Sequence, residues 1–431
     1  MFGCSDDEDS NEPCPDQPQL TTFEVSNINY DDNTDLSSAT FSAEINNIQL
    51  GINCEIVSIT NQGFVYGNSI QPTTSDNVIN VNGENFSYIF NDLPSETTFY
   101  VRVYLTNALG TFYGNEVNFT TPQSTNPVYL SSNGITIKAR NWAEAGMSGE
   151  INGVTYTIVD INTLTSMIYN EEDVTVLCTS KITSMYQMFY GSQFNQDISS
   201  WDISNVADMQ RMFFNSQFNQ DISNWDVSNV TNMGGMFAYS QFNQDISNWD
   251  VSSVINMSGN AVSGGMFQSS QFNQDISNWD VSNVTDMSGM FINNLYFNQD
   301  IGNWDVSSVT NMEQMFANSH FNQDIGNWEV SNVTNMYSLF YGSQFNKDIS
   351  SWDVSNITDM TALFINSQFN QDISNWDVSN VTNMGAMFAI SQFNQNLSNW
   401  DVSNVTECSE FSDDTPQWTL PQPNFTNCNP D

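Results

Sequence analysis

The sequence has very few positively charged residues. Its 431 residues include 6 Lys and Arg and one His against 49 Asp and Glu, so the formal net charge is −43. A charge of this sign and size repels nucleic-acid phosphates and anionic membrane surfaces, and we expect neither as a partner. The chain also lacks an apolar run of about 18 residues, which excludes a transmembrane helix at the level of sequence.

Features that carry catalysis are equally scarce. The single histidine, His320, stands where other repeats have Gln217 or Gln241, so we do not expect it to act as a base. There is no glycine-rich phosphate loop and no Cys/His spacing typical of a metal site. Carboxylates are abundant, but they recur in every repeat, whereas a general acid and a general base need two unlike environments. We therefore expect no enzyme.

What the sequence does contain is a tandem repeat. Near-copies of FNQDISNWDVSNVTNMGGMFAYSQ, residues 218–241, follow one another from Phe194 to about Cys408. One tryptophan marks each copy: Trp201, Trp225, Trp249, Trp279, Trp304, Trp328, Trp352, Trp376 and Trp400, at successive spacings of 24, 24, 30, 25, 24, 24, 24 and 24 residues. A nearly constant period in this range indicates stacked units that share one core.

The spacing of apolar residues changes within each repeat. Residues 225–227 alternate between apolar and polar, as in a strand, whereas the apolar residues of 230–237 follow helical spacing, with Ser228 and Asn229 as candidate N-caps. We therefore predict a leucine-rich-repeat-like solenoid with one parallel strand and one short helix in each 24-residue coil. An all-β sandwich should precede it.

The middle residue of the predicted strand is acidic and should point outward, because side chains alternate along a strand. The candidate binding face consists of Asp202, Asp226, Asp250, Asp280, Asp305, Glu329, Asp353, Asp377 and Asp401. Two interpretations of this face remain open. It is either solvated, with sodium nearby and raised carboxyl pKa values, or it holds Ca²⁺ bridged between adjacent coils, with Ser and Asn oxygens completing the shell. Calcium is thus the one candidate cofactor.

Composition divides the chain into five parts. Residues 1–18 form an acidic leader, and residues 19–122 contain short alternating segments separated by turn residues, as in a β-sandwich. Residues 126–181 are interpreted as a bridge and N-terminal cap, residues 182–407 as the repeats, and residues 408–431 as a C-terminal cap.

Six cysteines and one insertion complete the pattern. Cys408 and Cys428 should form a disulfide that closes the last coil, and Cys14 with Cys54 is a second candidate pair. If Cys4 is acylated, five cysteines remain, and Cys178 should be the free thiol. Six extra residues within 258–265 should loop out of the stack, with a role that the sequence leaves open.

Two resemblances concern the N-terminal part. The start, MFGCSDDEDS, resembles the end of a bacterial lipoprotein signal, with Gly3 and Cys4 similar to the end of a lipobox. This resemblance implies acylation of Cys4 and an outer-membrane lipoprotein on the cell surface, touching the membrane only through its lipid anchor. Residues 93–122 resemble the last two strands of a fibronectin type III domain, although Phe99 stands at the tyrosine-corner position.

The repeat motif DxSNVTxMxxMF, present in residues 226–237 and 377–388, resembles the BspA-like leucine-rich-repeat surface proteins of bacteria. The resemblance implies a cell-surface display scaffold or adhesin that binds an extracellular protein, a carbohydrate or a neighbouring cell. The alternative is a structural spacer or a self-associating surface-layer component without a specific ligand.

Overall fold

The computed structural model describes residues 17–31, 36–46, 57–259 and 264–430. The chain divides into two compact units, Met1–Tyr129 and Leu130–Asp431. Cys4, Cys14 and Cys54 lie outside the described residues, so the acylation and the Cys14–Cys54 pair stay predictions. The middle of the insertion at 258–265 also lies outside them.

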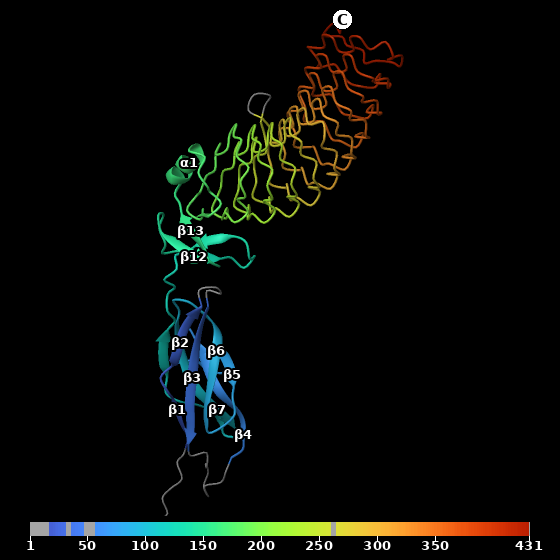
Figure 1. Cartoon of the computed structure of the whole chain (residues 1–431). Coiled ribbons are helices and arrows are strands. Elements are labelled where there is room, and N and C mark those ends of the chain that lie inside the picture. Colours follow the sequence, from blue (N-terminus) through green and yellow to red (C-terminus); the bar gives the residue numbers. More distant parts are fainter. Residues whose placement is uncertain (1–16, 32–35, 47–56, 260–263, 431) are drawn as a thin grey trace, which may run out of the picture. The chain divides into compact units, whose positions relative to one another are not determined.

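The first unit is all-β, as predicted (Figure 1). Its strands are β1 (Gln19–Thr22), β2 (Ser26–Asp31), β3 (Leu36–Asn46), β4 (Ile59–Gly67), β5 (Asn77–Asn80), β6 (Asn85–Pro94), β7 (Thr98–Asn107), β8 (Gly110–Tyr113) and β9 (Val117–Thr120). In one sheet β3 pairs with β1, β2 and β6, and in the other β4 pairs with β5 and β7, which also pairs with β8 and β9. Phe41 on β3 meets Phe64 on β4 at 5.7 Å between ring centroids, so the core lies between the two sheets.

The second unit starts with a cap of short elements. These are β11 (Ile137–Ala139), β12 (Ser148–Ile151), β13 (Val154–Ile158), α1 (Ile161–Tyr169) and β14 (Leu177–Cys178), preceded by β10 (Val128–Leu130), which spans the boundary between the units and pairs with β11. Helix α1 begins after Asp160, whose carboxylate accepts the Thr163 N–H at 2.8 Å, and it buries Leu164. Strand β14 runs parallel to β13 and leads into the repeats.

From Ile182 onward the chain winds into a stack of coils, one for each repeat (Figure 1). The N–H groups of Met209 and Phe213 donate to the carbonyl oxygens of Asn232 and Met236 in the next coil, each at 2.9 Å. The same donors and acceptors recur from coil to coil, because the repeat places like residues above one another.

The predicted coil of one parallel strand and one short helix is wrong. Among the described residues α1 is the only helix, and neighbouring coils are joined by isolated parallel bridges such as that between Asn232 and Asn256. The segment expected to be helical donates alternate N–H groups to the next coil instead of to its own preceding turn. Its backbone also enters the left-handed region, as at Arg211 with φ 56° and Tyr239 with φ 58°, which interrupts a right-handed helix.

The segment expected to be a strand is too tightly turned to form a ladder. The Trp225 N–H donates to the Ile222 carbonyl at 3.1 Å, and the Val230 N–H donates to the Val227 carbonyl at 2.9 Å. Two tight turns therefore flank residues 225–227, and this part of each coil stays irregular.

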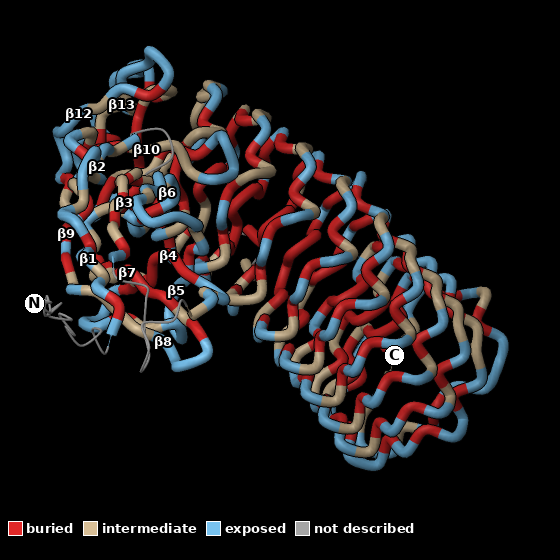
Figure 2. The backbone as a smooth tube through the Cα atoms, turned by 90° about the horizontal axis from the view of Figure 1, so that it is seen from below, coloured by how far each residue is buried: buried red, intermediate tan, exposed pale blue. Residues whose placement is uncertain are grey.

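The interior of the stack is built from columns of identical side chains. The rings of Trp225 and Trp249 stack at 6.5 Å between centroids, and those of Phe213 and Phe237 at 5.7 Å. Figure 2 shows these buried segments facing inward, with exposed residues at the outer corners of the coils. Each indole is also satisfied, because Trp225 Nε1 donates to the Ile198 carbonyl of the preceding coil at 3.2 Å.

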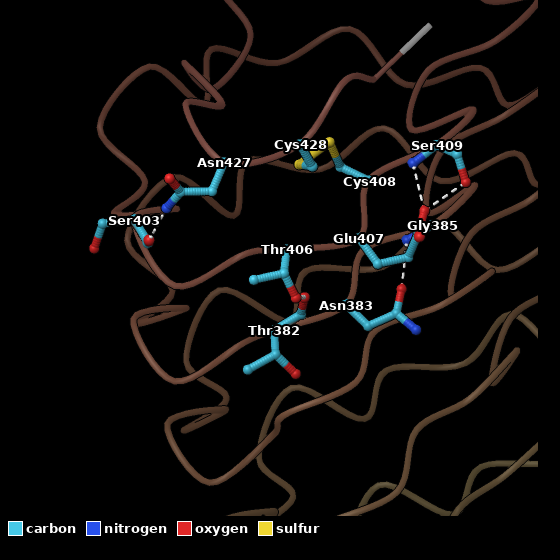
Figure 3. The surroundings of a disulfide bond; sticks show 10 residues. All are labelled: Thr382, Asn383, Gly385, Ser403, Thr406, Glu407, Cys408, Ser409, Asn427 and Cys428. Atoms are coloured by element: carbon cyan, nitrogen blue, oxygen red, sulfur yellow. Dashed lines mark hydrogen bonds between the residues drawn. A yellow bond between two sulfur atoms is a disulfide. The ribbon is translucent and has the colours of Figure 1, made fainter.

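A disulfide holds the last coil closed. Cys408 and Cys428, the pair expected from the sequence, are joined with 5.8 Å between their Cα atoms (Figure 3). Beside this disulfide the Asn427 side chain donates to the Ser403 carbonyl at 2.6 Å. The C-terminal segment also places Trp418 edge-on against Phe393, at 4.9 Å between ring centroids. The apolar end of the stack is thereby covered, as the last unit of a repeat array requires.

Candidate functional site

The acidic residues of the candidate binding face lie at the surface, with one exception. Trp225 and Val227, which flank one of them, are only 3% and 1% exposed. The exposed members are Asp226, Asp250, Asp280, Asp305, Glu329, Asp353, Asp377 and Asp401. They project from an irregular segment between two tight turns and not from a strand.

Asp202 is the exception, and its assignment to the binding face is wrong. It is 3% exposed, because the cap covers the first coil at this point. Its Oδ1 lies 3.5 Å from Lys138 Nζ, and its carboxylate accepts hydrogen bonds from the hydroxyls of Ser180 and Ser204. Asp202 thus joins the cap to the repeats and is not available to a partner.

Serine hydrogen bonds favour the charged form of five of the exposed aspartates. Asp250 Oδ1 accepts the hydroxyl of Ser252 at 2.6 Å and its N–H at 3.1 Å. These bonds, the hydroxyl first, hold the pKa of Asp250 below its usual value, since they favour the ionised form. The same cause lowers the pKa of Asp305, Asp353, Asp377 and Asp401.

The expectation of raised pKa values is therefore wrong for these five residues. Repulsion from Asp377 in the next coil does raise the pKa of Asp353, but the serine bonds outweigh it.

A second acidic row, which the sequence analysis did not single out, belongs to the FNQD part of each repeat. Its exposed members are Asp197, Asp221, Asp245, Asp275, Asp300, Asp324, Asp348 and Asp372. Each has a Ser or Gly two residues later whose N–H it accepts, at 2.9 Å from Ser247 to Asp245, for example. This fixed spacing of two is the signal that would have revealed the row. Between Asp348 and Asp372 the surface is hollowed by about 300 Å³.

A column of asparagines holds the coils in register beside this row. Asn219 Oδ1 accepts the N–H of Asn243 at 2.9 Å, and Gln244 Nε2 donates to the Asn219 carbonyl at 3.1 Å. The asparagine bond recurs from Asn195 at one end to Asn394 at the other. Adjacent coils are thus held in register, and one carboxylate of this row follows in each coil.

Exposed tyrosines also lie on the coils, and the sequence analysis missed them. Tyr186 and Tyr190 are 49% and 50% exposed, and Tyr337 and Tyr341, which hold the same positions in a later coil, are 39% and 37% exposed. Alignment of the repeats with one another would have found Tyr186 and Tyr337, because other coils carry small or polar residues such as Gly234 at their position.

The described residues contain no ready-made metal centre. Among them, no three His, Cys, Asp or Glu side chains are grouped so as to hold a metal ion. Calcium bridged by two carboxylates of adjacent coils, with other oxygens completing its shell, stays a prediction. His320 is exposed in an irregular stretch after a turn, and burial raises the pKa of the Cys178 thiol, which lowers its reactivity.

The described part of the chain has few helical residues. None of its helices has the length and apolar character needed to cross a membrane.

Comparison with known proteins gives one match. No curated protein and no solved structure matches the chain. A family model described as "Mycoplasma protein of unknown function, DUF285" matches residues 160–264, 260–344 and 340–426, which include the repeats and part of the cap before them. Because these stretches cover more than half of its 431 residues, the chain belongs to this DUF285 family.

Proposed function

We propose that this protein is a non-catalytic display scaffold at a cell surface, which binds an extracellular protein or carbohydrate through the acidic face of its coils. The observation that supports this proposal is the unpaired charge of that face. None of its eight exposed members, from Asp226 to Asp401, forms an ion pair with a described Lys, Arg or His. Evenly spaced carboxylates suit many weak contacts with one basic or hydroxyl-rich surface.

The cell-surface location rests on sequence resemblance. The repeat resembles those of the BspA-like surface proteins, and Gly3 with Cys4 resembles a lipobox. In this proposal the N-terminal β unit, which resembles fibronectin type III domains, serves as a spacer. Metabolic labelling with a fatty-acid analogue tests the anchor: label on the wild-type protein and none on Cys4→Ser supports it, and equal label on both contradicts it.

The acidic face is tested by removing charge without removing hydrogen bonds. Asn396, at the end of the second acidic row, shows that asparagine can take the aspartate role in such a turn, because it accepts the N–H and hydroxyl of Ser398 at 3.1 and 2.8 Å. A variant with asparagine in place of Asp250, Asp280, Asp305 and Asp353 should therefore fold normally. An array of extracellular matrix proteins and glycans first identifies the partners that the wild-type protein binds. We expect the variant to bind these partners at least about tenfold more weakly than the wild type does.

The remaining outcomes of this experiment are also informative. Equal binding by the variant would show that the partner binds another surface, and retention of no partner at all would favour the structural spacer. Concentration-dependent association of the pure protein in sedimentation velocity would favour the self-associating layer component.

Calcium is tested separately by isothermal titration into chelator-treated protein at about 0.15 M NaCl. Heat of binding together with a rise in melting temperature would support a divalent layer on the acidic face. No heat and no shift at millimolar calcium would exclude it and leave a basic or carbohydrate partner.

A further inference from the structure

The interior of the stack contains a column of phenylalanine rings, one from the start of each coil. Its members are Phe194, Phe218, Phe242, Phe272, Phe297, Phe321, Phe345, Phe369 and Phe393, with 6.1 to 6.4 Å between neighbouring centroids. Each ring between the two ends is stacked on both faces. At the far end Trp418 covers Phe393, at 4.9 Å between centroids.

The near end of the column has no such cover from the preceding segment. In later coils each tryptophan Nε1 donates to an isoleucine carbonyl of the preceding coil, and this isoleucine lies four residues after the phenylalanine of the column. Trp201 Nε1 makes the equivalent bond to the Val174 carbonyl, at 3.0 Å. Counting back four residues from Val174 places Asn170 at the phenylalanine position. Asn170 is exposed at the C-cap of α1, and the described rings that stack on Phe194 are Phe189 and Phe218, so no ring from the segment before the first coil covers it.

A pocket of about 320 Å³ lies at this end, between the C-terminal turn of α1 and the first coil. Ile168 and Phe194, both only partly buried, form its apolar lining. Asn195 also lines it, and among the described residues no acceptor meets the Asn195 N–H. In the next coil the equivalent N–H, that of Asn219, is taken by Asn195 Oδ1 at 2.9 Å.

We propose that this pocket binds an extended peptide segment of a partner protein. The segment inserts one aromatic side chain against Phe194 and presents an acceptor oxygen to the Asn195 N–H. The other end of the same stack supplies the template: there a segment that leaves a tight turn places Trp418 on Phe393, and the N–H of Thr419 donates to Asn394 Oδ1 at 2.8 Å.

The rim of the pocket indicates the charge of the segment. Glu171 and Glu172 both line the pocket and are exposed, so a Lys or Arg beside the inserted aromatic residue is favoured by charge. The ligand class is thus a basic peptide segment with one aromatic residue. This inference is independent of the function proposed for the acidic face.

Calorimetry with the full-length protein tests the pocket. The probe is the peptide acetyl-Lys-Phe-Asn-Lys-amide, and its matched control carries alanine in place of phenylalanine. Because burial of a phenyl ring contributes strongly to affinity, we expect the alanine peptide to bind at least about tenfold more weakly. Ile168→Trp should fill the pocket and weaken binding of the phenylalanine peptide by a similar factor.

Three further variants separate pocket binding from other effects. Phe194→Leu keeps apolar bulk but removes the ring, and it should weaken binding even if Ile168→Trp disturbs α1. Glu171→Gln with Glu172→Gln should weaken binding and flatten its dependence on NaCl. Tyr337→Ala removes an exposed ring far along the array and should leave binding unchanged.

Several results would overturn the proposal. These are no binding of the phenylalanine peptide, equal binding of both peptides, or unchanged binding by Phe194→Leu. If acetyl-phenylalanine-amide binds as tightly as the peptide, the occupant is a free aromatic molecule. If the wild-type protein dimerises and Ile168→Trp is monomeric, the occupant is a segment of a second copy and not of a partner.

Discussion

The tryptophans of the array both fill the core and form a hydrogen bond to the preceding coil, as Trp304 illustrates. Its ring is 4% exposed in the tryptophan column, and its Nε1 donates to the Ile276 carbonyl at 3.1 Å. We expect Trp304→Ala to lower the free energy of unfolding by about 3 to 5 kcal/mol, because it leaves a large cavity. Trp304→Phe keeps most of the ring but leaves a buried carbonyl without its donor, at a cost of about 1 to 3 kcal/mol.

Urea denaturation measures both losses. The exposed Tyr337→Ala is the control and should change stability by less than about 0.5 kcal/mol. Equal stability of Trp304→Phe and wild type would show that the indole hydrogen bond is energetically neutral.

The serine hydrogen bonds make a prediction about pH. The Ser355 hydroxyl is the largest cause of the lowered pKa of Asp353, at 2.6 Å from Oδ1. Ser355→Ala should therefore raise the pKa of Asp353 toward its ordinary value, as followed by carbon NMR of labelled aspartates. Ser351→Ala, whose hydroxyl bonds to the Gly326 carbonyl instead, is the matched control. An unchanged pKa of Asp353 in Ser355→Ala would contradict the assignment.

The same direction of shift predicts the acid stability of the array. A carboxyl group with a lowered pKa in the folded state stabilises the fold at pH values above its unfolded pKa of about 3.9. This contribution is lost as pH falls through the lower, folded pKa. Melting temperatures should thus stay level between about pH 7 and 5 and fall below about pH 4. A rise in stability on acidification would mean that relief of repulsion between the acidic rows dominates instead.

Among the structural elements, the C-terminal segment depends on its disulfide. Cys408 and Cys428 close a loop with a sequence separation of 20, which contributes roughly 3 kcal/mol in the chain-entropy model. In Cys428→Ser the amide of Thr419, which donates to Asn394 Oδ1, should exchange with solvent early. The amide of Asn243 in the middle of the array is the control and should keep its protection. Equal exchange of Thr419 in both proteins would show that apolar packing alone holds this segment.

At the opposite end, the cap depends on one ion pair. Lys138 is 25% exposed on its side chain and lies 3.5 Å from the buried Asp202. Lys138→Met leaves that carboxylate without its cation, and we expect a loss of about 1 to 3 kcal/mol after allowance for the partial exposure of the lysine. The double variant with Asp202→Asn should recover much of the loss. Chemical denaturation measures both, and equal stability of the single and double variants would exclude coupling between the two residues.

The array as a whole should tolerate the loss of one complete coil. Deletion of residues 321–344 removes 24 residues and leaves Phe345 in the place of Phe321, with every column intact. We expect a cooperative melt lowered by less than about 5 °C, since only one interface of the stack is lost. Deletion of the 12 residues 321–332 has half that length, breaks the register and should abolish the cooperative melt. Similar melts for both deletions would contradict coil-by-coil stacking.

Much of this architecture was predictable because it depends on periodicity. The tryptophan spacing predicted a repeat, and the contrast between apolar and acidic neighbours placed Trp225 and Val227 inside with Asp226 outside. The turn-rich strand pattern of residues 19–122 predicted the all-β unit, which is confirmed. The family match likewise covers the repeats.

The error in the repeat has a physical cause. The apolar residues of 230–237 can be buried on one face either by a short helix or by a series of tight turns. Their spacing alone therefore does not distinguish these two backbone forms. The choice depends on where the backbone N–H groups find acceptors. Here the neighbouring coil supplies them, and isolated turns with residues in the left-handed region replace the helix.

The sequence by itself therefore determined the period, the inward and outward residues, the all-β character of the first unit and the acidic character of the array. These follow from the order of apolar and polar residues along the chain. Only the tertiary structure decided the backbone form of the coil, the burial of Asp202 beside Lys138, and the pocket next to Phe194. Each of these features depends on which groups a neighbouring coil or the cap places next to the residue. Those groups are distant in the sequence, so the local order of residues does not reveal them.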